Sequence, residues 1–146
     1  MIIIRFAEND TEIKRCFPVM FELRPHLKDE EEFLLKVKNL NEIAGYLLAF
    51  LEEDRMIKSV AGIRISECLA WGKFLYVDDL VTLSSERNKG YADRLFDWLI
   101  IYAKQNSCDQ FHLDSGVQRF PAHRFYLKKK MDITSHHFAI KFKELQ

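Results

Sequence analysis

The pattern of hydrophobic and polar positions changes its period several times along the chain, so it predicts strands and helices in succession. Strands are expected where apolar residues cluster or alternate with polar ones, at 2–6, 45–51, 57–68, 74–83, 110–114 and 133–142. Helices are expected where apolar residues recur every three or four positions, at 30–40, 90–105 and 121–129 and in a first helix with Ile13, Phe17, Met20 and Leu23 on one face. The sequence therefore predicts a mixed α/β architecture that closes with a strand.

Several residues at the ends of these elements support the boundaries. Asp10 or Thr11 is suited to cap the first helix, and Asp29 is suited to cap the second. Pro18 is expected to kink the first helix. The polar turn at 52–55 joins two predicted strands into a hairpin.

The composition excludes several classes of protein. A chain of 146 residues with 48% hydrophobic and 30% charged content fits one globular domain, residues 1–146. Its 22 basic and 22 acidic residues cancel, so neither nucleic acid nor an anionic membrane is expected as a partner. The apolar stretches are shorter than the roughly 18 residues of a spanning helix, and the N-terminal one is too brief for a signal peptide. We expect a soluble cytoplasmic protein.

The cysteines and histidines do not have the spacing of a metal site. Cys16, Cys68 and Cys108 are scattered and odd in number, so they are expected to be reduced thiols rather than a disulfide framework. His136 and His137 are neighbours on a predicted strand, where their side chains diverge. The sequence therefore predicts no metal.

The junction between the strand at 74–83 and the helix at 90–105 contains a basic turn. Helix N-termini leave backbone N–H groups unpaired, and Arg87 and Lys89 add positive charge there. Gly90 would let a pyrophosphate approach the backbone. The turn is neither a P-loop nor a G-x-G-x-x-G motif, and from these residues alone an ordinary strand-to-helix turn is an equal alternative.

Three motifs in order carry a resemblance to a known family. Residues 87–92 (Arg-Asn-Lys-Gly-Tyr-Ala) fit the pattern [QR]-x-x-G-x-[GA], and residues 122–126 (Ala-His-Arg-Phe-Tyr) fit A-x-x-[FL]-Y. Residues 76–80 (Tyr-Val-Asp-Asp-Leu) fit the Y-[LV]-[ED]-D-[IL] strand of polyamine-acetylating members. The chain resembles the GNAT superfamily of N-acetyltransferases over nearly its whole length, and residues 111–119 with 136–138 resemble a bacterial subgroup.

The resemblance implies a fold, an activity and a cosubstrate. The fold would be GNAT-like, a mixed, mostly antiparallel sheet of about six or seven strands flanked by about four helices. The activity would be direct transfer of the acetyl group of acetyl-CoA to a primary amine of a small molecule or peptide, without a metal. The implied cofactor-binding residues are Leu80, Val81, Thr82, Arg87, Asn88, Lys89, Gly90, Tyr91 and Ala92.

The resemblance also assigns catalytic roles. Asp78 would accept the proton of the amine, directly or through water, and Tyr126 would protonate the leaving thiolate. A backbone N–H within 79–81 would stabilise the oxyanion. Asp79 points away from Asp78 in a regular strand, although a bulge would remove that alternation. The alternatives are an Asp78 that pairs with Arg64 or a lysine, and a Tyr126 that packs against the core.

Several positions depart from the family pattern. Ser84 stands where Pro is frequent and Asn88 where Gly is frequent, which changes the stiffness of the loop. Arg119 replaces an Asn, so any contact of that Asn is in doubt. Lys130-Met131 replaces a Gly-Phe pair and removes the favoured left-handed helix stop.

Other functions and several details remain open at this stage. A catalytically silent acyl-CoA-binding regulatory module is the alternative function, and an interaction domain without a ligand is a third. Trp71, Tyr46 and Arg24 are candidate residues of an acceptor pocket, but core or surface roles are favoured for them. The sequence leaves open the acceptor, the length of the acyl group, a homodimer, and the roles of Arg119, His136 and His137.

Overall fold

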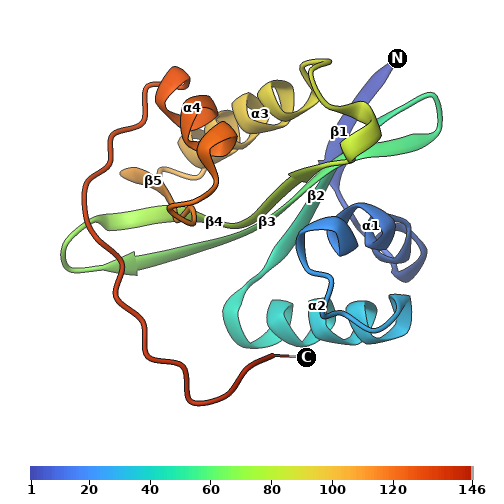
Figure 1. The fold of residues 1–146 in the computed structure, drawn as a ribbon, viewed down its shortest axis with the longest axis horizontal. Helices are drawn as coiled ribbons and strands as arrows, with labels where there is room; N and C mark the ends of the chain where they lie inside the picture. Colours follow the sequence, from blue (N-terminus) through green and yellow to red (C-terminus); the bar gives the residue numbers. More distant parts are fainter. Residues whose placement is uncertain (146) are drawn as a thin grey trace.

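A computed structural model describes residues 1–145, which form a five-stranded mixed sheet covered by four α-helices (Figure 1). The strands are β1 (Ile2–Phe6), β2 (Leu47–Glu53), β3 (Met56–Cys68), β4 (Gly72–Thr82) and β5 (Gln110–Leu113). The helices are α1 (Asp10–Leu23), α2 (Glu30–Ala44), α3 (Tyr91–Gln105) and α4 (Phe120–Lys128), with a short 3-10 turn η1 (Ser84–Glu86) before α3.

The strands follow one another in the sheet in the order of the sequence. The order is β1-β2-β3-β4-β5, with antiparallel pairs up to β4 and a parallel pair between β4 and β5. The predicted hairpin is present, and Asp54 and Arg55 at its turn both have positive φ, as a tight hairpin turn requires. The mixed, mostly antiparallel sheet is confirmed, with five strands in residues 1–145 rather than six or seven.

The helices cover the two faces of the sheet, with α1 and α2 on one side and α3 and α4 on the other (Figure 1). Neighbouring residues of β2 point to opposite faces, so Phe50 packs in the cluster with α1 and Leu51 in the cluster with α3. The predicted apolar stripe of the first helix is present there, with Met20 buried and Phe17 partly buried. The same alternation that predicts strands therefore builds two cores, one on each face.

Asn9, not Asp10 or Thr11, caps the first helix. Its backbone is extended and its Oδ1 accepts a hydrogen bond from the Glu12 N–H at 2.9 Å. A cap must lie outside the helix while its side chain reaches the third helical N–H, and Asp10 is already helical. The predicted cap of the second helix is confirmed, since Asp29 accepts from the Glu32 N–H at 2.9 Å.

The predicted closing strand at 133–142 is wrong for this structure. The chain after α4 is extended but pairs with no strand among residues 1–145, because no neighbouring strand lies beside it. Lys130 nevertheless makes the left-handed turn that ends α4, with φ of +67°, although it carries a Cβ where the family favours glycine. In residues 1–145, no helix has the length and apolar character needed to cross a membrane.

Candidate functional site

The short strand β5 pairs along its whole length with the first half of β4. The parallel register runs from Phe74 opposite Gln110 to Val77 opposite Leu113, where β5 ends. Residues 78–82 of β4 therefore have a strand neighbour only on the side of β3. The other edge of this segment presents backbone N–H and C=O groups to a cleft.

A β-bulge in β4 interrupts the alternation of side chains next to this open edge. Gly62 of β3 lies opposite Asp79 and Ile63 lies opposite Val77, so Asp78 is the extra residue. Val77 and Leu80 lie three positions apart and both contact the cluster under α3. The expectation that the two aspartates diverge as in a regular strand therefore does not apply here.

Asp78 forms a two-pronged ion pair with Arg64. Arg64 Nε donates to Asp78 Oδ2 at 2.6 Å and Arg64 Nη2 donates to Oδ1 at 2.9 Å. The guanidinium also lies 5.3 Å from the centre of the Tyr76 ring. The hydrogen bond that Arg64 donates to Asp78 raises the pKa of Arg64, so the guanidinium stays charged. The pairing with Arg64 considered from the sequence is thus present, and Asp78 also lines the cavity described below.

Asp79 is held by two side chains from distant parts of the chain. The Tyr46 hydroxyl donates to Asp79 Oδ2 at 2.7 Å, and Arg24 Nε donates to Oδ1 at 2.8 Å. Arg24 Nη2 also donates to the carbonyl oxygen of Asp78 at 2.9 Å, which fixes the bulge. Burial raises the pKa of Tyr46 well above its usual value, so its hydroxyl remains a donor.

Gly62 makes room for this arrangement. A Cβ at Gly62 would lie 1.8 Å from the Tyr46 hydroxyl oxygen, so only glycine lets Tyr46 reach Asp79. Sequence reasoning favoured core or surface roles for Tyr46 and Arg24, with an acceptor pocket as the alternative, and did not predict that they meet at Asp79. The sequence signal that could have found this contact is Gly62, a glycine inside a predicted strand, because such a glycine lets another group approach the strand backbone closely.

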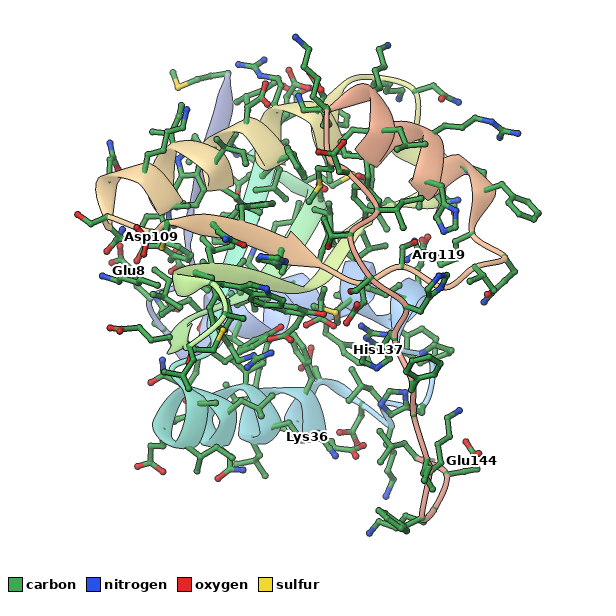
Figure 2. The ribbon with its side chains drawn as sticks, turned by 90° about the vertical axis from the view of Figure 1, so that its left-hand side faces the viewer. Glu8, Lys36, Asp109, Arg119, His137 and Glu144 are labelled. Carbon is green, nitrogen blue, oxygen red and sulfur yellow. The ribbon has the colours of Figure 1, made fainter. Side chains whose placement is uncertain are left out.

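The open edge of β4, the end of β5 and α4 enclose a cavity of about 680 Å³. Asp78 and Tyr126 both line it, as do Arg24, Arg119 and His137. Figure 2 shows Arg119 and His137 at the same end of β5, one before α4 and the other on the segment after α4. Its other lining residues are Leu23, Arg64, Tyr76, Val77, Leu80, Leu113, Asp114, Gly116 and Gln118.

Tyr126 lies half-buried on α4, and its ring packs beside Phe96 and Phe125. Burial raises the pKa of Tyr126, while the nearby Arg119 acts in the opposite direction. The hydroxyl is therefore protonated at neutral pH and is able to donate. Tyr126 therefore packs against the core and also lines the cavity.

Polar groups from β5 and the segment after it form another wall of the cavity. Tyr76 donates a hydrogen bond to Asp114, and His137 Nδ1 lies 3.5 Å from Asp114 Oδ2. The Ser115 hydroxyl is buried without a hydrogen-bond partner in the part of the chain that the structure describes. This wall offers the Asp114 carboxylate to the cavity.

The turn before α3 presents unpaired backbone donors. Gly90 precedes the helix with φ of +85°, and the position of its missing Cβ has no atom within 4 Å. The first bond within the helix runs from the Arg94 N–H to the Gly90 carbonyl, and no side chain caps the helix. The N–H groups of 91–93 are therefore available to an anion.

The side chains of this turn differ in their availability. Arg87 is 59% exposed, and its nearest carboxylate is Glu22 at 3.9 Å. Lys89 is bound to Glu86 at 2.5 Å, and Glu86 is bound to Lys58 at 2.6 Å. Tyr91 is buried and its hydroxyl bonds to Glu53, so only its backbone faces the turn.

Among residues 1–145, the remaining histidine and cysteine side chains do not gather at one site that could hold a metal ion. His112 stacks on Trp71 with ring centres 3.5 Å apart, and burial lowers its pKa. Across residues 1–145, no group of three or more His, Cys, Asp or Glu side chains is arranged to hold a metal ion.

Comparisons with known proteins agree on one family. The model of the acetyltransferase (GNAT) family matches residues 4–131. The chain is 33% identical over 129 residues to the uncharacterized N-acetyltransferase YhdJ of Bacillus subtilis (strain 168). The aligned region covers 88% of this chain and 90% of that protein.

Solved structures share the fold at low sequence identity. A structure titled as a transcriptional regulator from Bacillus halodurans C-125 has a TM-score of 0.85 and 18% identity, covering 97% of this chain and 100% of that one. The aminoglycoside N-acetyltransferase AAC(6')-Iy in complex with CoA has a TM-score of 0.83 and 13% identity, covering 97% of this chain and 94% of that one.

Proposed function

This chain belongs to the GNAT acetyltransferase family, and from that premise we propose that it transfers the acetyl group of acetyl-CoA to a primary amine of a small molecule or peptide. The observation that carries the proposal is the cleft beside β4, where Asp78 and Tyr126 line one cavity next to an unpaired strand edge. An acyl transfer needs a proton acceptor, an oxyanion donor and a proton donor for the leaving group, and this cleft offers all three.

In this proposal, acetyl-CoA binds along the open edge and the turn before α3. The pyrophosphate is held by the free N–H groups of 91–93 and by Arg87, the more exposed and less paired of the two cations. Gly90 leaves the approach to the backbone open. The backbone at 80–82 pairs with the amide groups of the pantetheine arm, as a neighbouring strand would.

The reaction proceeds by direct attack of the amine on the thioester carbonyl. The C–N bond forms as the carbonyl electrons move to oxygen, and a backbone N–H within 79–81 stabilises that oxyanion. The C–S bond then breaks, and the Tyr126 hydroxyl gives its proton to the thiolate. A tyrosine has a reference pKa of about 10 and a thiol one of roughly 8.5. Burial raises the pKa of Tyr126, so its hydroxyl holds the proton until the thiolate develops.

Asp78 attracts the acceptor ammonium and takes its proton through water. Its two oxygens already accept hydrogen bonds from Arg64, so the carboxylate is oriented but also occupied. A water between Asp78 and the amine relays the proton to a carboxylate oxygen, and the neutral Asp78 then keeps a hydrogen bond from Arg64 in place of the ion pair. Asp114 lines the same cavity, together with Arg24, Arg64 and Arg119.

The pairing of Asp78 with Arg64 also favours a second candidate, an acyl-CoA-binding regulatory module without turnover. In that case the cleft binds the cosubstrate, but no group removes the proton of an amine.

Mass spectrometry of acetyl-CoA reactions with pooled amines and peptides tests the proposal. We expect at least one acceptor to gain an acetyl group while CoA is released, and we expect Gly90→Val to lose that activity. CoA binding without any acetylated product would support the regulatory module instead. Absence of both would refute the acetyl-CoA assignment.

A further inference from the structure

Two arginines contact Asp78, the residue proposed to receive the amine proton. Arg64 donates to both carboxylate oxygens of Asp78, at 2.6 and 2.9 Å, and Arg24 Nη2 donates to the carbonyl oxygen of Asp78 at 2.9 Å. Both arginines line the cavity beside β4. An acceptor amine next to Asp78 therefore lies close to two guanidinium groups as well as to one carboxylate.

These contacts leave donors on both guanidinium groups. Each guanidinium has five N–H donors. Arg64 uses its Nε and Nη2 on Asp78, and Arg24 uses its Nε on Asp79 at 2.8 Å and its Nη2 on Asp78. Within residues 1–145, Nη1 of neither side chain has an acceptor, and the two side chains are 34% and 41% exposed. Donors therefore remain for an anion in the cavity.

The charges around the cavity cancel. Its lining includes three arginines and two aspartates, and Asp79, the partner of Arg24, brings the carboxylates to three. His137 also lines the cavity and adds no negative charge. An acceptor with two or more positive charges therefore finds no excess of carboxylate to bind.

An amine that carries a carboxylate a few bonds away fits this pattern of charges. Its ammonium faces Asp78, while its carboxylate meets the remaining N–H groups of Arg24 and Arg64. Like charges at this range repel, whereas a guanidinium holds a carboxylate through charge-assisted hydrogen bonds. The negative group of the acceptor thus removes the repulsion that a simple amine would meet.

We propose that the acceptor is an amino acid, whose carboxylate is held by Arg24 and Arg64 while its amine lies at Asp78. This inference rests on the proposed function, because it takes the cavity as the place where the acceptor binds. The reaction keeps the same balance: the amine nitrogen gains the acetyl group, the C–S bond breaks, and the products are an N-acetyl amino acid and CoA.

The proposal disfavours polyamines, although residues 76–80 fit the strand of polyamine-acetylating members. That motif contains both aspartates of the strand. Arg24 and Arg64 lie outside it, and each forms an ion pair with one of those aspartates. The partners of the motif, rather than the motif itself, therefore decide which acceptor charge the cavity favours.

Competition between amino acids and their amides tests the acceptor class. The common amino acids, the matching amides and linear polyamines are mixed at equal concentration with acetyl-CoA, and products are identified by mass spectrometry. We expect kcat/KM for the best amino acid to exceed that for its amide by about 10- to 100-fold, the usual range for hydrogen bonds to a charged group. The amine of the amide is less basic and more often free to attack at neutral pH, so intrinsic reactivity favours the opposite result.

Arg24→Gln and Arg64→Gln test whether this cavity holds the carboxylate. Each is expected to lower the ratio of kcat/KM for the amino acid to that for its amide by about tenfold or more. A general loss of stability or of proton transfer lowers both rates alike, so the ratio reports recognition. Arg15→Gln is the matched control, because Arg15 on α1 pairs with Glu52 at 2.8 Å away from the cavity, and it is expected to keep the ratio.

An amide or a polyamine that is acetylated as well as every amino acid would overturn the proposal. It would also fail if Arg24→Gln and Arg64→Gln both kept the ratio of the wild-type protein.

Equilibrium dialysis separates this inference from acetyl transfer itself. If no amine in the pool gains an acetyl group, the proposed function fails, and dialysis of the same pool against the protein with saturating CoA still tests the carboxylate subsite. Retention of an amino acid over its amide, lost in Arg24→Gln, would support the subsite. Equal retention of the two, or retention of neither, would overturn it.

Discussion

The Tyr126 hydroxyl is the single group on which turnover depends most in the proposed reaction. Tyr126→Phe keeps the ring that packs beside Phe96 and removes only the proton donor. We expect kcat to fall by about 10²–10⁴-fold, or roughly 3–5 kcal/mol, the usual contribution of a general acid, while the melting temperature and acetyl-CoA affinity persist.

The matched control for this change is Tyr102→Phe, at a partly buried tyrosine on α3 that stacks on Trp98. It is expected to leave kcat within a few-fold. Measuring kcat and the melting temperature on the same preparations separates catalysis from packing. A fully active Tyr126→Phe enzyme would leave Tyr126 with a packing role only.

Asp78→Asn tests the path of the amine proton. Without a negative charge to receive that proton, the acceptor must already be deprotonated to attack, so the rate at neutral pH falls and the activity profile moves to higher pH. The change also leaves the Arg64 guanidinium without its ionic partner, so the melting temperature is measured as well. Cofactor affinity is expected to stay nearly constant.

Asp79→Asn provides the comparison, because Asp79 is also paired with an arginine but is held by Tyr46. It is expected to lower stability more than to shift the pH profile. If Asp79→Asn alone moved the pH profile of activity, Asp79 rather than Asp78 would be the proton acceptor.

At the residue level, the sequence could predict the motif residues but not their partners. Asp78, Tyr126 and Gly90 stand out because their types recur at fixed spacings within short segments. Arg24 meets Asp79 across 55 positions of sequence, and Tyr46 meets it across 33. No local period encodes such contacts, since they follow from how the strands and α1 are packed.

The turn before α3 depends on a backbone conformation as well as on its charges. Gly90→Val places a branched side chain where an anion would approach the backbone, and it does so at a positive φ that valine resists. We expect acetyl-CoA binding, measured by calorimetry, to weaken at least tenfold, together with a moderate loss of stability.

Gly45→Val separates these two effects. Gly45 ends α2 with φ of +69°, and nothing lies within 4 Å of its missing Cβ, so the strain is similar but the location is remote from the turn. This variant is expected to lose stability while keeping its affinity for acetyl-CoA. Equal affinity in both folded variants would mean that the turn does not hold the cosubstrate.

At the level of elements, periodicity predicts local conformation but not pairing. The strand predicted at 133–142 has the right alternation, yet hydrogen bonds to a neighbour are what make an extended segment a strand. The four helices and the first five strands are predicted because each buries a face whose apolar residues recur with the period of that element. Residues 133–142 have an apolar face by the same criterion, but within residues 1–145 that face packs against no other element.

On the scale of the whole molecule, the cleft arises from unequal strands. β4 has 11 residues and β5 has four, so β4 continues past its neighbour and exposes an edge between the two helix layers. The sequence predicts both strands but not their register, which decides how much of β4 stays open. Asp78 of β4 and Tyr126 of α4 line the cavity beside this open edge, and the turn before α3 follows the end of β4.

Acetyl-CoA is expected to stabilise the whole fold, because its proposed site joins β4 with α3 and α4. A ligand that binds only the folded state adds about 2.7 kcal/mol at about 100 times its dissociation constant. For a domain of about 150 residues, each kcal/mol raises the melting temperature by about 3 °C, so a shift of about 8 °C is expected. Gly90→Val is expected to lose the shift and Gly45→Val to keep it, whereas a wild-type protein unmoved by millimolar acetyl-CoA would favour an interaction domain without this ligand.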